Sequence, residues 1–319
     1  MLRGVKRLKG PEALTVALVG GQILGLARTM LVAALLGTEI QGEAITIGLI
    51  TGFFSTVLVL NTAWQLVQSK HGNDPDFKAS LQGVALARGF VSSAGILVLG
   101  WIVLGLFDLS QLRGPLCLIA WIPALEGALS LDAWERLRER SYKSLAFVEV
   151  AGPIGSLLAA LIALSFTQTV WVIAIATFAG SFSRLVASHI LRRGPWRLRV
   201  HLRFSRPIIQ YSIPLIPAGM FFWINTQSDR ILLLLSEQVE GLPPSSLAEL
   251  GAYGTVASMI LMPLALVAKV TRAVVVPRLS TFTSDPAAFN RLFSRFGWRL
   301  LTLALVVVSA AGIAGDSAF

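Results

Sequence analysis

The sequence predicts an all-α polytopic membrane protein with about nine transmembrane helices. Hydrophobic residues make up 55% of its 319 residues and charged residues only 14%, whereas a soluble domain carries about 25% charged residues. The mean hydropathy is +0.72, and the apolar residues gather into nine long runs separated by short polar segments. A chain with this composition needs lipid as its solvent.

Each run is long enough, or nearly so, to cross the ~30 Å hydrocarbon layer as a helix of about 20 residues. The runs are continuously apolar and do not alternate as the strands of a membrane barrel do, so we expect helices. In chain order the expected spans are residues 13–36, 44–67, 81–107, 116–131, 145–166, 170–191, 208–235, 252–276 and 298–314.

The Lys and Arg residues predict the orientation of the chain. Nineteen of the 27 lie on the side of the membrane that holds the N-terminus, and only Arg113 lies in a loop on the other side. Because basic loops are retained in the cytoplasm, we expect a cytoplasmic N-terminus in the cytoplasmic (inner) membrane. The net charge of +10 is then an orientation signal that anionic membrane lipids attract, and nucleic acid is not an expected partner.

Catalytic and metal-binding motifs are absent from the sequence. Cys117 is the single cysteine, and His71, His189 and His201 are far apart. There is no glycine-rich phosphate loop, HExxH motif or Ser/His/Asp set. We therefore expect no cofactor, no metal and no enzymatic activity.

Six arginines between residues 192 and 206 divide the chain into two halves. We expect an N-lobe of six helices at residues 1–191, a basic cytoplasmic linker at 192–207, and an incomplete C-lobe at 208–319. Arg28 in the first span and Arg230 in the seventh occupy similar positions, and the helices that follow them open at Gly42 and Gly251. Both first helices run in the same direction, which predicts parallel repeats about an axis normal to the membrane.

Arg28 and Arg88 are charged residues within spans and are therefore candidates for a functional role. At 100° per residue, Arg28 shares a helix face with Gly21 and Gly25, and small residues mark faces where membrane helices pack closely. Arg28 is thus expected to point into the bundle or a wet cavity. Arg88 similarly shares a face with Ser92. Arg184 lies toward the inner end of its span, where its side chain is expected to reach the head groups.

The seventh span contains the most polar stretch of any span, and Pro214 upstream is expected to kink it. We predict that Arg230 belongs to the cationic cavity and that this stretch forms a polar cavity wall. The alternative is that Asp229 pairs with an arginine only to neutralise two charges for folding. The wall residues are Asn225, Gln227 and Asp229.

Three further carboxylates, Glu126, Asp132 and Glu149, lie in or at the edges of spans. One of them binds a coupling proton or sodium ion, or each pairs with an arginine of a loop. The sequence leaves both alternatives open.

Short motifs carry a resemblance to a known family. The residues ILGLAR at 23–28 and LVA at 31–33 resemble the first helix of the MOP superfamily, which includes the MurJ-type lipid II flippases. The residues YSIPLIP at 211–217, followed by WIN at 223–225, are similar to the start of the second half of Wzx-type polysaccharide flippases. The residues LGAY at 250–253 and VPRLS at 276–280 are similar to the next helix of that family.

The resemblance implies a MOP/MATE-like fold and an alternating-access flippase for cell-surface polysaccharide biosynthesis. Its substrate would be a polyprenyl-pyrophosphate-linked oligosaccharide, and other polysaccharide-assembly proteins are candidate partners. Arg28 matches the cavity arginine of the first helix in MurJ-type proteins, whereas Arg88 and Arg230 join the cavity on helix geometry alone. Guanidinium groups suit a pyrophosphate, which they bind through paired donors.

The chain departs from that family in its length, because members usually have twelve or more spans. A fragment, a shortened gene or a partner that completes the C-lobe are the alternatives. Other functions also remain open: a MOP exporter of cationic drugs, which should have a more acidic cavity, or a truncated, non-transporting assembly partner. A membrane polymerase or ligase should carry catalytic Arg or His in a large outer loop, and the longest outer loop, residues 236–250, has neither.

Overall fold

The computed structural model describes residues 10–58, 60–199, 201–236 and 246–271, together with eight residues between 287 and 302. All regular structure in these residues is helical, which confirms the predicted fold class. The elements are α1 (Pro11–Val57), α2 (Thr62–Gln68), α3 (Pro75–Leu106), the short 3-10 helix η2 (Ser110–Leu112), α4 (Arg113–Ile119), α5 (Ile122–Gly127), α6 (Asp132–Arg138), α7 (Lys143–Leu164), α8 (Trp171–Ile190), α9 (Leu202–Ser212), α10 (Leu215–Leu235) and α11 (Leu247–Val270).

Five helical segments of the described chain are long and apolar enough to cross a membrane, or six if the bent pair formed by residues 110–127 and α6 is one span. Large apolar side chains such as Val98 and Phe221 are 64% and 68% exposed, as lipid-facing side chains would be. The chain is therefore a multi-pass membrane protein. Eight of the nine expected spans overlap described helices. The ninth, 298–314, lies outside the described residues apart from Trp298 and Thr302.

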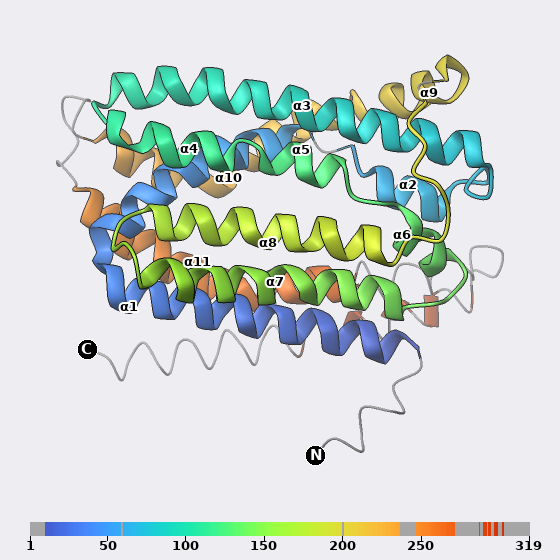
Figure 1. The fold of residues 1–319 in the computed structure, drawn as a ribbon, viewed down its shortest axis with the longest axis horizontal. Coiled ribbons are helices and arrows are strands. Elements are labelled where there is room, and N and C mark those ends of the chain that lie inside the picture. The colour runs from blue at the N-terminus through green and yellow to red at the C-terminus, as the bar shows by residue number, and fades with distance from the viewer. Residues whose placement is uncertain are drawn as a thin grey trace. The chain divides into compact units, whose positions relative to one another are not determined.

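The second expected span, 44–67, ends in α2, whereas its residues 44–57 and the whole first span lie in α1. The 47 residues of α1 would extend about 70 Å, more than twice the hydrocarbon thickness. Gly37 interrupts the helix with φ 78° and ψ 176°, and the second half of α1 runs back beside the bundle (Figure 1). The polar loop expected between residues 36 and 44 is absent, because a single non-helical residue is enough to reverse the chain.

Two other expected spans are interrupted helices. The segment 116–131 is divided into α4 and α5 around Trp121, and the chain bends by 44° between residues 110–127 and α6. The segment 208–235 is divided into α9 and α10 beside Pro214, where the sequence predicts a kink.

Glycine residues bring α7 and α8 into close contact. A Cβ atom on Gly180 would lie 3.1 Å from the carbonyl oxygen of Gly152 and 3.0 Å from the Cβ of Ser156. The first half of α1 packs on the same pair, where Val32 is buried with Ala160 and other small residues of α7 and α8. This is the small-residue packing typical of membrane helices.

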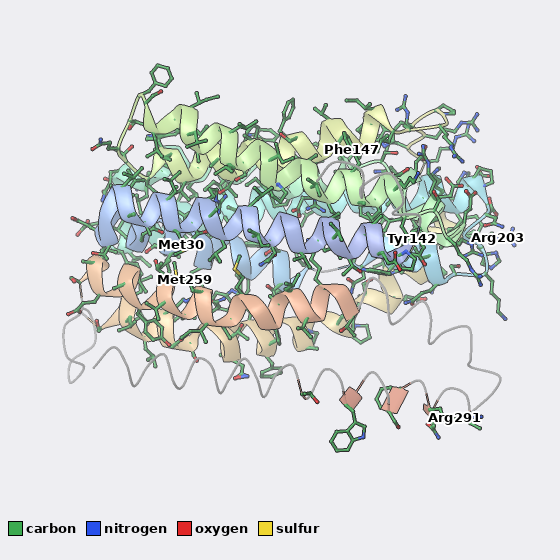
Figure 2. All side chains as sticks on the ribbon, turned by 90° about the horizontal axis from the view of Figure 1, so that it is seen from below. Met30, Tyr142, Phe147, Arg203, Met259 and Arg291 are labelled. Carbon is green, nitrogen blue, oxygen red and sulfur yellow. The ribbon has the colours of Figure 1, made fainter. Side chains whose placement is uncertain are left out.

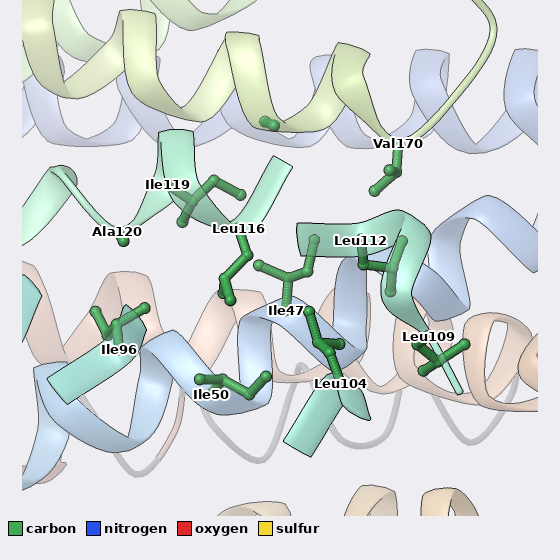
Figure 3. Packing of buried hydrophobic residues seen from close by; sticks show 11 residues of the cluster. Ile47, Ile50, Ile96, Leu104, Leu109, Leu112, Leu116, Ile119, Ala120 and Val170 are labelled. Carbon is green, nitrogen blue, oxygen red and sulfur yellow. The ribbon is translucent and has the colours of Figure 1, made fainter. Parts of the chain in front are cut away.

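A second core joins the second half of α1 with α3 and α4 (Figure 3). Its largest members are fully buried, among them Ile47 of α1, Ile96 of α3 and Leu116 of α4. Helix α5 also lies close to α3, since a Cβ on Gly127 would be 2.5 Å from the carbonyl oxygen of Ala85. These two cores fix α1 and α3, which carry Arg28 and Arg88, whereas neither core includes a residue of α10.

The chain forms two compact units, residues 1–254 and 255–319, and the site described below belongs to the first. Helices α2, α6 and α9 lie at one end of this unit (Figure 1). Side chains rich in nitrogen gather at this end, where Arg203 lies (Figure 2). We call it the basic end. The division into an N-lobe, a linker and a C-lobe stays a prediction.

Candidate functional site

Arg28 lies in the first half of α1 and points toward α7. Its Nη1 donates a hydrogen bond of 2.6 Å to Oγ of Ser156, a residue that is only 7% exposed. On the same face, Gly21 allows the approach of Pro153, because a Cβ there would lie 3.2 Å from that proline ring. The expected face of α1 therefore packs against protein at Gly21 and Val32, whereas a Cβ on Gly25 would meet nothing within 4 Å. Among the residues that the structure describes, no carboxylate lies within ion-pair distance of Arg28.

Arg88 of α3 faces the end of α1. Its Nη1 lies 3.4 Å from the carbonyl oxygen of Leu58, the residue that caps α1. Glu126 of α5 is near enough to interact with it electrostatically. On the same face Ser92 is 1% exposed, so the expected face is buried here too. Arg88 thus donates a hydrogen bond to a carbonyl group at the C-terminal end of α1, in addition to any role in a cavity.

The polar stretch of α10 joins this helix to the start of α11. Arg230 Nη1 donates to Oε1 of Gln227 at 2.9 Å, and its Nη2 lies 3.4 Å from the carbonyl oxygen of Gly254. Asp229 accepts hydrogen bonds from the backbone N–H of Arg230 and from the hydroxyl of Tyr253. Asp229 also interacts electrostatically with Arg230, so the alternative that the two charges are paired for folding stays open beside the cavity wall. Asn225 is exposed.

The three arginines have separate surroundings. Arg28 contacts α7, Arg88 contacts the end of α1, and Arg230 contacts residues of α10 and the first turns of α11. They share no partner among the contacts of the described residues. A single cationic cavity that contains all three remains a prediction.

The comparison with protein-family models identifies the family. The model of the polysaccharide biosynthesis protein family matches residues 31–311, which is most of the chain. The chain belongs to the polysaccharide biosynthesis protein family. This agrees with its resemblance to Wzx-type flippases. No curated protein and no solved structure matches the chain.

In this family member, Arg184 of α8 is an intramembrane charge whose partners sequence reasoning missed. Its Nη2 donates to Oε1 of Glu149 on α7 at 3.0 Å, and its Nη1 lies 3.9 Å from Glu126 on α5. Gly152 makes room for the arginine, because a Cβ there would lie 2.7 Å from its Cγ. The expectation that Arg184 extends to the head groups is therefore wrong. Its carboxylate partners were visible in the sequence, but not their proximity.

Asp132 is paired in the same way at the basic end. Its carboxylate accepts a hydrogen bond from the Lys78 ammonium group, which also contacts Glu135, and a second one of 2.7 Å from the backbone N–H of Arg193. The three carboxylates thus all have basic neighbours, but the side chains that pair with them belong to Arg184 within a span and to Lys78, not to the loop arginines that the sequence predicts. Pairing is the better supported of the two alternatives for Glu126, Asp132 and Glu149.

Proposed function

We propose that this chain translocates a polyprenyl-pyrophosphate-linked oligosaccharide across the cytoplasmic membrane by alternating access, for cell-surface polysaccharide biosynthesis. The proposed role is transport rather than catalysis. It extends the family assignment, which covers residues 31–311, to a definite substrate class and direction.

The observation that carries this proposal is the environment of Arg28. Its guanidinium is held by a neutral hydroxyl, that of Ser156, within a membrane-spanning helix. A cation inside the bilayer costs several kcal/mol, so an arginine kept there without a carboxylate partner in the described chain favours an anionic ligand. A pyrophosphate provides several oxygen atoms for the paired donors of a guanidinium group.

The pairing of two carboxylates, Glu149 and Asp132, weighs against an exporter of cationic molecules. Such a protein needs a negative charge that is accessible to its substrate. Here Glu149 binds Arg184 at 3.0 Å, and Asp132 binds Lys78. The charges that these residues carry are already compensated by the protein.

The proposed orientation, lobes and cavity residues are those that the sequence predicts. The basic end is cytoplasmic because it carries most of the Lys and Arg residues, and it includes the N-terminus of α1. Residues 1–191 form one lobe and 208–319 form part of the other, joined by residues 192–207. In states in which the two lobes separate, the cavity is lined by Arg88, Arg230 and the polar residues Asn225, Gln227 and Asp229.

The test is binding of a polyprenyl-pyrophosphate disaccharide to the purified full chain in lipid nanodiscs. We expect Arg28→Ala to weaken binding tenfold or more, which corresponds to about 1.4 kcal/mol. Arg28→Lys keeps the charge and should retain part of the affinity. Ser156→Ala removes only the hydrogen-bond partner and should bind at least as well as the wild type.

Arg113→Ala is the matched control. Arg113 is also an arginine, but it lies over the ring of Trp101 at 4.6 Å, at the opposite end of the first unit from the basic end. Its removal should leave binding unchanged. Equal affinity of the wild type and Arg28→Ala would refute the assignment of Arg28, and the absence of binding by the wild type would refute the proposed substrate.

A further inference from the structure

A separate cavity lies at the basic end, between the end of α2, the turn that follows it, the start of α3 and α9. Its volume is about 450 Å³, within the range of roughly 300–1,000 Å³ that is usual for ligand sites. None of the candidate residues in the membrane lines it. All of its lining residues belong to the first compact unit.

The charge of this cavity is positive. Arg203 of α9 lines it, with its guanidinium 5.6 Å from the ring centroid of Phe204, and the imidazole of His71 lies in the same wall. No Asp or Glu lines the cavity. In the described chain no carboxylate lies within ion-pair distance of either basic group. An anion would therefore find forked donors that are not already occupied by an acid.

The remaining lining suits a ligand with hydroxyl groups and an apolar ring face. Gln65 and Gln68 each contribute an amide, which both donates and accepts hydrogen bonds. The aromatic wall is formed by Phe77 and Phe204, whose ring centroids are 5.5 Å apart. Inorganic phosphate would use only the basic groups, whereas a phosphorylated saccharide would also use the amides and the aromatic surface.

The turn that lines the cavity is fixed before any ligand arrives. Arg138 of α6 donates through Nη1 to the carbonyl oxygens of Leu66 and Val67, at 3.3 and 3.2 Å, and also to that of Ser69. A Cβ on Gly72 would lie 2.5 Å from the same Nη1. A rigid binding turn lowers the entropy that is lost when a ligand binds.

We propose that this cavity receives the phosphorylated saccharide head group of the lipid-linked substrate before the head group enters the membrane-spanning part of the protein. The proposal rests on the proposed function, and it assigns the first contact to Arg203, His71 and the two glutamines. Helices α2 and α3 belong to the predicted N-lobe, and α9 begins in the linker that leads to the C-lobe. A head group in this cavity would therefore contact both the N-lobe and the linker.

The test uses the full chain in nanodiscs of zwitterionic lipid, with a soluble hexose 1-phosphate as the probe. We expect the wild type to bind it more tightly than inorganic phosphate or the free hexose. Arg203→Ala and Gln68→Ala should each weaken binding, the former tenfold or more. Arg206→Ala is the matched control, because Arg206 is an exposed arginine of the same helix that does not line the cavity.

Three results would overturn the proposal. In the first, the wild type binds hexose 1-phosphate no more tightly than inorganic phosphate. In the second, Arg203→Ala binds hexose 1-phosphate as tightly as the wild type does. In the third, the addition of phosphatidylglycerol to the nanodiscs abolishes the binding of hexose 1-phosphate. The last result would identify a phospholipid head-group site. If the wild type binds the probe but does not translocate the lipid-linked saccharide, only the proposed function fails.

Discussion

Gly42 and Gly251 approach so closely that a Cβ atom on Gly251 would lie 2.7 Å from the backbone nitrogen of Gly42. A Cβ on either glycine would also overlap a carbonyl oxygen of the other helix, that of Leu247 or of Thr38. The sequence places these two glycines at equivalent positions of the predicted repeats. In an arrangement with twofold symmetry, residues at the axis contact their own equivalents. The parallel repeat requires such a contact and stays a prediction.

Gly251→Ala should separate the first turns of α11 from α1. Because the obstacle is backbone rather than a flexible side chain, we expect a loss of about 1–3 kcal/mol in the free energy of unfolding. Gly48→Ala is the control, since a Cβ there meets nothing within 4 Å and the change should stabilise the helix by up to about 1 kcal/mol. Denaturation in detergent micelles measures both variants. Equal stability would show that the helices are not in contact here.

Gly37→Ala tests backbone strain without crowding. A Cβ on Gly37 meets nothing within 4 Å, but its φ is +78°, and with ψ 176° this conformation is almost restricted to glycine. We expect destabilisation of about 1–3 kcal/mol. Gly25→Ala, in the same helix and equally open, should be neutral or stabilising. If the two variants have the same unfolding free energy, α1 does not reverse at Gly37.

Arg184→Ala should remove from the buried carboxylate of Glu149 the cation that contacts it at 3.0 Å. Glu149 is 10% exposed, and breaking one side of a buried pair costs about 3–5 kcal/mol. The double variant with Glu149→Gln should recover part of that loss. A double-mutant cycle in detergent measures the coupling, and strictly additive effects would contradict the ion pair.

Arg138→Ala should loosen the turn after α2, because three backbone carbonyls lose the same donor. Amide hydrogen exchange in residues 66–72 is expected to accelerate, while exchange in α7 and α8 stays unchanged. Arg140→Ala provides the comparison, as Arg140 is a nearby exposed arginine. Unchanged exchange in Arg138→Ala would mean that another contact holds the turn.

Hydropathy was sufficient to place most of the helices, because lipid imposes the same requirement on every span. Helical spacing also predicted that Arg28 faces protein, since Gly21 and Val32 mark the same side. The breaks within the spans were only partly predictable. Pro214 indicated one, whereas the break at Trp121 depends on how α5 packs against α3.

The charge pairs could not be predicted from one sequence. Arg184 and Glu149 are separated by 35 residues, and the rotation of one helix about its axis decides whether they meet. Arg28 illustrates the same point, because its face was predictable but Ser156 as its partner was not. Nothing in the pattern of residues indicated that α2, α9 and the turn after α2 enclose a cavity.

The hydrogen bond between Arg28 and Ser156 also constrains biosynthesis. These residues are separated by 128 positions, so the ribosome makes the arginine long before its partner. The nascent first helix must therefore enter the bilayer with a bare guanidinium, at a cost of about 2.5–3.5 kcal/mol if it lies at the helix centre. The apolar residues on both sides of Arg28 in this span offset that cost until α7 is inserted beside it.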